Sequence, residues 1–415
     1  MPMIERRVHD WGRLPGGCGQ FHVHPLKTVQ APPSTTRATC MKSLALFMTL
    51  GVSLEGWKKG GWLRRELALY EEHARNGVRI FLVSYGGDED LKIARDFAEL
   101  TVLINEYRLP KRLYAALLPY LHFQRLKGVD LIKTNQLMGA KQAVTAARLL
   151  GVPVVVRQGY SHVEFKAQAK GIGSRRYRQA IAYERTWLRK ADLCQYTTEN
   201  AKAGAVERLG ADNCKHVVIP NYVVDRLWEP TFHNFREVKA NDTFRLGFWG
   251  RLAKQKNLEN VVAACSGLNV ELVLAGEGSE RRAIEQRAQS MRVGINFLGQ
   301  IPHEKLARSM AECDAFIIAS DLEGHPKSLI EAMFFGMPVI AVDSPGIKPF
   351  VVDGETAVVG QTSIASLRST ILRARGLSPE KRRTLASNAR SFARSAYSLE
   401  AISRRELDVY RQLLC

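Results

Sequence analysis

The amino-acid sequence predicts an α/β protein with two doubly wound, Rossmann-like domains. The chain has 415 residues, which is enough for two domains of ordinary size. Short apolar runs alternate with segments of helical periodicity, and this alternation stops at a polar stretch, residues 223–243, before it resumes. Strands that alternate with helices are typical of parallel sheets covered by helices on both faces.

The predicted N-terminal domain covers residues 41–222. Residues 1–40 are rich in Gly, Pro and Thr and have no apolar period, so we expect a disordered extension or a mis-assigned start. The runs with strand character in this domain are 41–51, 79–85, 130–135, 153–159, 191–198 and 216–221.

The predicted C-terminal domain covers residues 244–395 and follows the interdomain linker, 223–243. Residues 396–415 are helical and charged, and one alternative is that this helix crosses back to the N-terminal domain. The runs with strand character are 244–250, 270–276, 295–299, 314–320, 338–342 and 356–360.

Composition limits the class of protein. No run reaches the roughly 18 apolar residues of a membrane span. The seven cysteines are scattered and include no CxxC, which favours unpaired thiols in the cytoplasm over disulfides or a zinc site. The net charge is +19, of which residues 1–225 carry +14, so the N-terminal half could attract an anionic partner.

A strand, a loop and a helix bring together the first candidate site residues. Glu323 follows the strand at 314–320, and Glu331 lies in the second turn of a helix that Pro326 starts and Gly336 ends. Ligands of open α/β sheets bind at the carboxyl ends of strands, and free amides at a helix N-terminus favour a phosphate. A nucleotide sugar suits two carboxylates with an anion between them, whereas two solvated surface charges are the alternative.

Two cations follow another strand, at 244–250. Arg251 and Lys256 stand before a helix and could neutralise a diphosphate leaving group, although Lys254 could replace Lys256. A solvated basic loop is the alternative. The Gly-x-Gly turn at 276–278 is a weak nucleotide signal, because Arg281 stands where a third glycine is required.

Together these segments resemble family 4 of the glycosyltransferases, which have the GT-B architecture. The resemblance covers nearly all of residues 41–400, and its most specific part is the E-x7-E element with its flanking EAM and GMPVI. It is carried by the segments GRLAKQKN, LVLAGEGSE, INFLGQIPHEKLARSMAECDAFIIAS, EGHPKSLIEAMFFGMPVIAVDSPG and VVDGETAVV, and by SLEGWKKGGWLRRELALYEEHARNGVRIFLVSYGG in the N-terminal half.

The resemblance implies roles for individual residues. Glu323 would contact the donor sugar, Glu331 the ribose, and Arg251 with Lys256 the diphosphate. The family generally retains anomeric configuration and uses neither a metal nor another cofactor. Further donor-binding positions implied in this way are Gly324, His325, Ser328, Leu329, Gly299, Ile301, Gly60 and Gly61.

This sequence departs from the family at several positions. Many members carry a histidine after the strand that matches 153–159, but here Arg157 stands in that loop and His162 comes later, so both are acceptor-side candidates. His325 stands where Phe is commoner, and Phe350 stands where many members have Glu.

Other charged segments invite competing interpretations. Residues 175–190 interleave aromatic side chains with six cations, which suits an anionic membrane surface, and residues 111–127 are a second candidate. A solvated helix that packs its aromatics into the core is the alternative. Nucleic-acid binding is not expected because no motif supports it. The acids at 88–90 are interpreted as solvated, not as a metal site.

The sequence therefore predicts a retaining glycosyltransferase, cytoplasmic or peripheral on the inner face of the plasma membrane. It would transfer a sugar from a UDP- or GDP-sugar to a glycan or lipid-linked acceptor, in polysaccharide or lipopolysaccharide assembly. A sugar-nucleotide epimerase or a non-catalytic sugar-nucleotide-binding protein on the same fold remain the alternatives.

Overall fold

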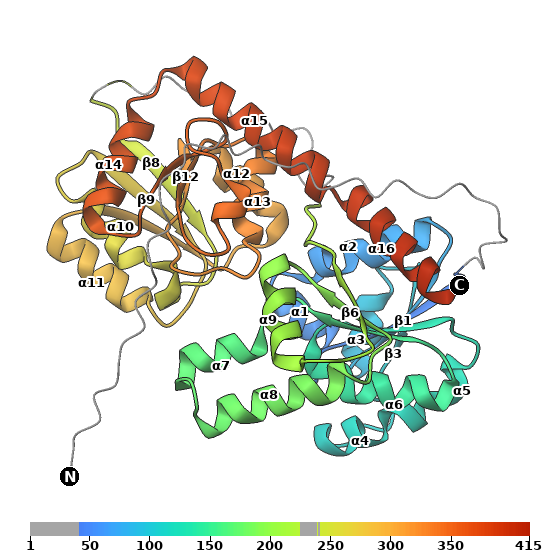
Figure 1. The fold of residues 1–415 in the computed structure, drawn as a ribbon. Helices are drawn as coiled ribbons and strands as arrows, with labels where there is room; N and C mark the ends of the chain where they lie inside the picture. Colours follow the sequence, from blue (N-terminus) through green and yellow to red (C-terminus); the bar gives the residue numbers. More distant parts are fainter. Residues whose placement is uncertain (1–40, 225–238, 240) are drawn as a thin grey trace, which may run out of the picture. The chain divides into compact units, whose positions relative to one another are not determined.

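Two parallel β-sheets organise the computed structural model of the protein, which describes residues 41–224, 239 and 241–415 (Figure 1). The expectations for residues 1–40 and for most of the linker lie outside the described residues. The two sheets confirm the predicted α/β fold with two doubly wound layers.

The N-terminal sheet has seven parallel strands in the order β3-β2-β1-β4-β5-β6-β7. The order reverses between β1 and β4, which is the kind of position where α/β sheets bind ligands. The strands are β1 (Ser43–Phe47), β2 (Arg79–Val83), β3 (Leu100–Leu103), β4 (Leu131–Thr134), β5 (Val154–Gln158), β6 (Leu193–Tyr196) and β7 (Lys215–Val218).

Helices cover both faces of this sheet. The side chains of α4, α6, α8 and α9 join the core on one face, and those of α1, α2, α3 and α16 join the core on the other. The helices before β7 are α1 (Leu54–Lys59), α2 (Leu63–Arg75), α3 (Asp88–Ala94), α4 (Lys111–Leu121), α5 (Phe123–Leu126), α6 (Ala140–Leu150), α7 (His162–Lys170), α8 (Arg175–Leu188) and α9 (Glu199–Leu209).

The C-terminal sheet has six parallel strands in the order β10-β9-β8-β11-β12-β13. Its strands are apolar on both sides, as expected of a sheet buried between helices. They are β8 (Phe244–Trp249), β9 (Val270–Ala275), β10 (Gly294–Gly299), β11 (Ala315–Ile318), β12 (Val339–Val342) and β13 (Val358–Gly360).

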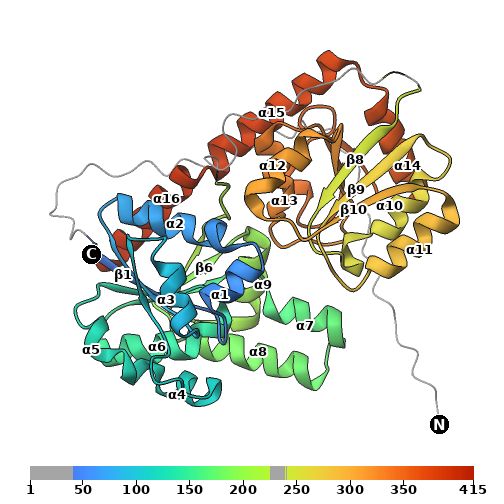
Figure 2. The ribbon, with the colours of Figure 1, turned by 180° about the vertical axis from the view of Figure 1, so that it is seen from behind.

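The remaining helices pack around the second sheet or leave it. Helix α16 joins the core of the N-terminal sheet through Leu407 and Tyr410, and it lies beside α2 in both ribbon views (Figures 1 and 2). The helices are α10 (Leu258–Cys265), α11 (Arg281–Met291), α12 (His303–Ala311), α13 (Lys327–Phe335), α14 (Ile364–Arg375), α15 (Pro379–Tyr397) and α16 (Leu399–Leu414). No helix in the described residues is both long and apolar enough to cross a bilayer.

Candidate active site

Helix α13 begins where the loop after β11 ends. Pro326 precedes the first helical residue, Lys327, so the proline caps the helix and does not form its first turn. We expected free amides in the first turn of this helix, and Lys327 is an exception, because its amide donates to the His325 carbonyl at 2.9 Å. Within the described residues, no acceptor takes the amides of Ser328 and Leu329, which leaves two donors for an anion.

Glu323 and Lys256 form an ion pair that joins the loop after β11 to the loop after β8. Their side chains are only 8% and 14% exposed, so the pair is screened less than a surface pair. The Ser320 hydroxyl donates to the same Glu323 Oε1 at 2.6 Å. Lys254 is exposed, so Lys256 is the better placed of the two lysines.

A glycine in the next loop allows the Glu323 backbone to approach closely. A Cβ on Gly346 would lie 1.8 Å from the Glu323 carbonyl oxygen, and Gly346 has a φ of +82°. The Glu323 amide also donates to the Pro345 carbonyl at 3.0 Å. Only glycine fits this position, so the turn after β12 fixes Glu323 through its backbone.

The Gly-x-Gly turn after β9 has a packing role. A Cβ on Gly276 would lie 1.9 Å from the Gly250 carbonyl oxygen, and one on Gly278 would lie 2.1 Å from that of Leu252. Both glycines therefore let this turn press against the loop that carries Arg251. The turn is a weak match to a nucleotide-binding motif, but it positions Arg251, which is a candidate to bind the diphosphate.

Glu331 and Lys327 are engaged by two residues of α2 that the sequence did not point to. Lys327 Nζ donates to Glu66 Oε1 at 2.9 Å, and Arg65 Nη1 lies 3.6 Å from Glu331 Oε1. Burial raises the pKa of the Glu66 carboxyl, but the charges of Lys327 and Arg65 outweigh burial and lower it to about 2. Helix α2 therefore contributes a charged pair to the surroundings of α13.

Other predicted donor-binding residues also lie near one another. Gln300 Nε2 donates to the Gly60 carbonyl at 2.6 Å, and a Cβ on Gly61 would lie 3.7 Å from the Ile301 carbonyl oxygen. Gly299 has a φ of +66°, and its carbonyl accepts from the Gly276 amide at 2.7 Å. The turns at 60–61 and 299–301 are thus in contact, as donor-site loops from both halves would be.

The His325 side chain packs among aromatic rings. Its centroid lies 5.2 Å from that of Phe350 and 5.6 Å from that of Tyr397, both in edge-to-face geometry. Both ring nitrogens are buried without a partner in the described residues. Burial, followed by the charges of Lys327 and Arg157, lowers the pKa of His325 to about 3.

The two acceptor-side candidates, Arg157 and His162, differ in their contacts. Arg157 lies on β5 and not in the loop after it, which corrects the sequence-based expectation. Its side chain donates to Asn221 Oδ1 at 2.9 Å and to the Asn135 carbonyl at 3.0 Å, and its charge acts on Glu66 and His325. His162 starts α7, and its Nδ1 is buried without a partner in the described chain.

Tyr160 lies between these two candidates in the sequence, which did not point to it. Burial raises the pKa of its hydroxyl, and the charge of Arg251 opposes that rise. The loop after β5 therefore lies within electrostatic range of Arg251.

Two other features lie apart from this site. Asp90 is buried and accepts from the amides of Leu54 and Glu55, so the interpretation of residues 88–90 as solvated is wrong for this residue. The described residues contain no cluster of three or more His, Cys, Asp or Glu side chains suited to a metal.

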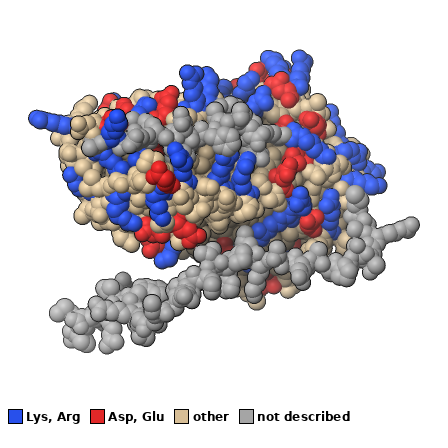
Figure 3. All heavy atoms as spheres, turned by 90° about the horizontal axis from the view of Figure 1, so that it is seen from above, with Lys and Arg blue, Asp and Glu red and all other residues tan. Residues whose placement is uncertain are grey.

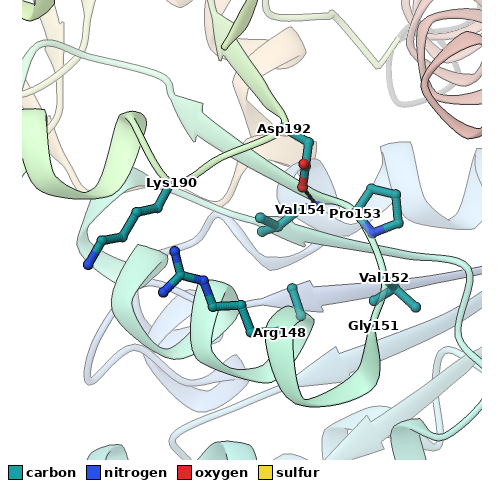
Figure 4. Close-up of a pocket in the computed structure, with 8 residues that line it drawn as sticks. Arg148, Gly151, Val152, Pro153, Val154, Lys190 and Asp192 are labelled. Carbon is teal, nitrogen blue, oxygen red and sulfur yellow. Dashed lines mark hydrogen bonds between the residues drawn. The ribbon is translucent and has the colours of Figure 1, made fainter. Parts of the chain in front are cut away.

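An open cavity of about 470 Å³ lies at the start of β5 (Figure 4). Arg148, Lys190 and Asp192 line it, and none of its lining residues is a predicted site residue.

Two family descriptions match the chain. Residues 60–222 match the "Glycosyl transferase 4-like domain", and residues 231–392 match "Glycosyl transferases group 1". Between them the two matches include both sheets apart from β1.

Curated relatives share parts of this chain. The chain is 23% identical to an alpha-D-kanosaminyltransferase of Streptomyces kanamyceticus, over 64% of this chain and 72% of the relative. It is 30% identical to a GDP-mannose-dependent alpha-mannosyltransferase of Mycolicibacterium smegmatis, over 28% of this chain and 29% of the relative. It also matches the EpsF protein of Bacillus subtilis, a glycosyltransferase by its name, over 53% of that protein at 28% identity.

Solved structures share the fold at low identity. A sucrose-phosphate synthase from Thermosynechococcus elongatus has a TM-score of 0.73 at 22% identity, with 90% of this chain and 99% of that chain covered. HepE from Anabaena, solved with UDP and glucose, has a TM-score of 0.69 at 18% identity, with 89% and 100% covered.

The fold and these matches define the chain as a glycosyltransferase of the GT-B class. Within that class it belongs to the family 4 type, with the group 1 domain in its C-terminal half.

Proposed function

We propose that this enzyme transfers a hexose-like sugar from a nucleotide diphosphate sugar to a hydroxyl group, with retention of anomeric configuration. The acceptor would be a glycan or a lipid-linked saccharide in cell-surface polysaccharide assembly, at the inner face of the membrane. One observation carries the proposal, namely the buried pair of Glu323 with Lys256 beside the N-terminus of α13.

The donor diphosphate would lie where positive charge and free amides converge. Lys256, Arg251 and the amides of Ser328 and Leu329 are the donors for it. Negative charge grows on the diphosphate as the glycosidic bond breaks, so fixed donors stabilise the transition state more than the ground state. Lys256 would exchange its bond to Glu323 for the phosphate, which frees Glu323 to accept from sugar hydroxyls.

The nucleoside would lie toward Glu331 and the turn at 299–301. Glu331 would accept from the ribose diol, and the backbone from Gly299 to Ile301 would border the base. The GDP-mannose dependence of one relative and the UDP of one structural neighbour support a UDP- or GDP-sugar as donor.

Retention would follow a front-face path. No enzymic nucleophile stands out in the sequence, so we propose that the acceptor hydroxyl attacks on the face that the diphosphate leaves. A departing phosphate oxygen would then take the acceptor proton. The segment at the carboxyl end of β5, with Arg157 on the strand, Tyr160 in the loop and His162 at the start of α7, would line the acceptor side, because Tyr160 lies within electrostatic range of Arg251.

Two substitutions test the site. Glu323→Gln and Lys256→Ala should each lower turnover at least about tenfold, or about 1.4 kcal/mol of barrier, whereas Lys254→Ala serves as the matched control. The measurement is initial rate across a panel of nucleotide sugars with and without acceptor saccharides. Turnover of both variants at the wild-type rate would contradict the assignment. Formation of an epimer from donor alone would favour an epimerase instead.

A further inference from the structure

The outward face of α4 is apolar, although helices on a protein surface normally turn polar residues outward. Leu113, Leu117 and Tyr120 recur at helical spacing and are 46%, 38% and 59% exposed, while Tyr114 and Leu118 fill the core on the inner side. These side chains leave an apolar stripe uncovered.

A second exposed apolar site lies at the turn between α7 and α8. Ile172 in this turn is 83% exposed. Among the large hydrophobic side chains exposed in the described residues, Ile172, Tyr107 and Tyr120 are the three most exposed; Tyr107 lies in the turn before α4, Tyr120 on α4 and Ile172 in the turn between α7 and α8. Large apolar side chains that are this exposed are candidates for an interaction site.

Both sites lie on the same side of the N-terminal sheet. Helices α4 and α8 belong to the layer that covers one face of this sheet, and both contact α6. In Figures 1 and 2, which differ by a rotation about the vertical axis, α4 and the turn between α7 and α8 occupy the same lower end.

Basic side chains outnumber acidic ones around both sites, although two cations near α4 are ion-paired, Arg108 with Asp88 and Arg125 with Glu106. Residues 107–129 contain five Lys or Arg and no Asp or Glu, and residues 165–183 also contain five and none. Lys111 and Arg112 flank the α4 stripe, and Arg175 and Arg176 follow the exposed turn, all four exposed. By contrast, acidic side chains are interspersed with basic ones on the face seen in Figure 3.

The structure also limits the role of the basic helix at 175–190. Arg185 Nε donates to the Arg208 carbonyl at 2.6 Å, and Arg189 Nη2 donates to the Leu209 carbonyl at 2.5 Å. These two arginines therefore cap the C-terminus of α9. Cations left for an external partner lie at the start of α8.

We propose that the outward face of α4 and the turn between α7 and α8 form a docking surface for an anionic phospholipid bilayer. The docking surface consists of Tyr107, Leu113, Leu117, Tyr120 and Ile172 with the cations Lys111, Arg112, Lys170, Arg175 and Arg176. Apolar side chains would enter the interface while the cations meet lipid phosphates. The inference deepens the proposed function, because it names the surface that would hold the enzyme near a lipid-linked acceptor.

Co-sedimentation with vesicles of phosphatidylcholine, with or without phosphatidylglycerol, tests the docking surface. The full chain should bind only the anionic vesicles, and binding should weaken as salt rises. Leu113→Ser/Leu117→Ser/Ile172→Ser should weaken binding at least about tenfold, as should Arg175→Gln/Arg176→Gln. The control is Leu372→Ser, which removes a leucine that is 44% exposed on α14.

Several outcomes would overturn this inference. The first is that the wild-type protein does not bind anionic vesicles. The second is that the triple serine variant binds them as well as the wild type does, with an unchanged circular dichroism spectrum. The third is that the wild-type protein forms a dimer in solution and the triple serine variant is a monomer. The donor assay is run in parallel on the same proteins. If vesicles bind but no nucleotide sugar is turned over, the docking surface stands and the proposed function fails, so the two can be told apart.

Discussion

At the scale of single residues, His325 and Phe350 are both departures from the family pattern, and they touch each other. The two rings meet edge to face beside Tyr397. A carboxylate at position 350 would lie next to an imidazole whose two nitrogens are buried, whereas Phe350 supplies an apolar wall. The two departures are therefore best understood as one packing arrangement.

This arrangement makes stability sensitive to acid. The folded pKa of His325 is about 3, below the unfolded value near 6.5, so unfolding takes up a proton. The stabilisation is complete above pH 6.5 and is lost as pH falls toward 3, with about 2 kcal/mol lost by pH 5. His325→Phe should remove this loss and fill the same space. Urea unfolding at pH 7 and pH 5 measures it, and an equal loss in both proteins would contradict this account.

Residue patterns predicted part of the site. The spacing of Glu323, Pro326 and Gly336 around an apolar run was enough to predict α13, because caps and turns are local. Nothing local linked Glu66 to Lys327, which are 261 residues apart in the chain. Such pairs depend on how the folded halves meet and leave no periodic signal.

At the scale of elements, a buried charged network holds α16 against the N-terminal sheet. Glu406 accepts from Lys133 Nζ at 2.5 Å, from Gln195 Nε2 at 2.8 Å and lies 2.8 Å from His73 Nε2. Lys133, His73 and Glu406 are all fully buried. These partners hold the pKa of the Glu406 carboxyl well below its usual value, despite burial.

Removing the Glu406 charge should release this helix. Glu406→Gln leaves the Lys133 ammonium buried without a carboxylate, which costs about 3 kcal/mol or more. We expect a clear fall in the midpoint of thermal or urea unfolding, and easier proteolysis of α16. The matched control is Asp408→Asn on the exposed side of the same helix. Equal midpoints for the two variants would show that the network does not stabilise the protein.

Elements with strong local patterns were predictable, and short ones were not. All strands of the C-terminal sheet were predicted within a few residues, because each is a predominantly apolar run. Strand β3 was missed, since it has four residues and two of them are partly or fully exposed. The sequence indicated the Gly276 turn but not its purpose, which depends on the contact with Gly250.

At the scale of the whole molecule, helices from both halves of the chain contribute to one charged site. Arg65 and Glu66 come from the N-terminal half, and Lys327 and Glu331 come from the C-terminal half. In the proposed function, the ribose would take the place of Arg65 at Glu331. Donor binding would therefore exchange contacts between the halves for contacts with the ligand.

The most direct test of the central claim is the affinity for the nucleoside diphosphate of the accepted donor. Isothermal titration compares the wild-type protein with Glu331→Ala, and Glu355→Ala, an exposed carboxylate, is the control. Loss of the ribose contacts should raise the Kd at least about tenfold in Glu331→Ala alone, which corresponds to about 1.4 kcal/mol. An unchanged Kd in Glu331→Ala would contradict the assignment of this site to the donor.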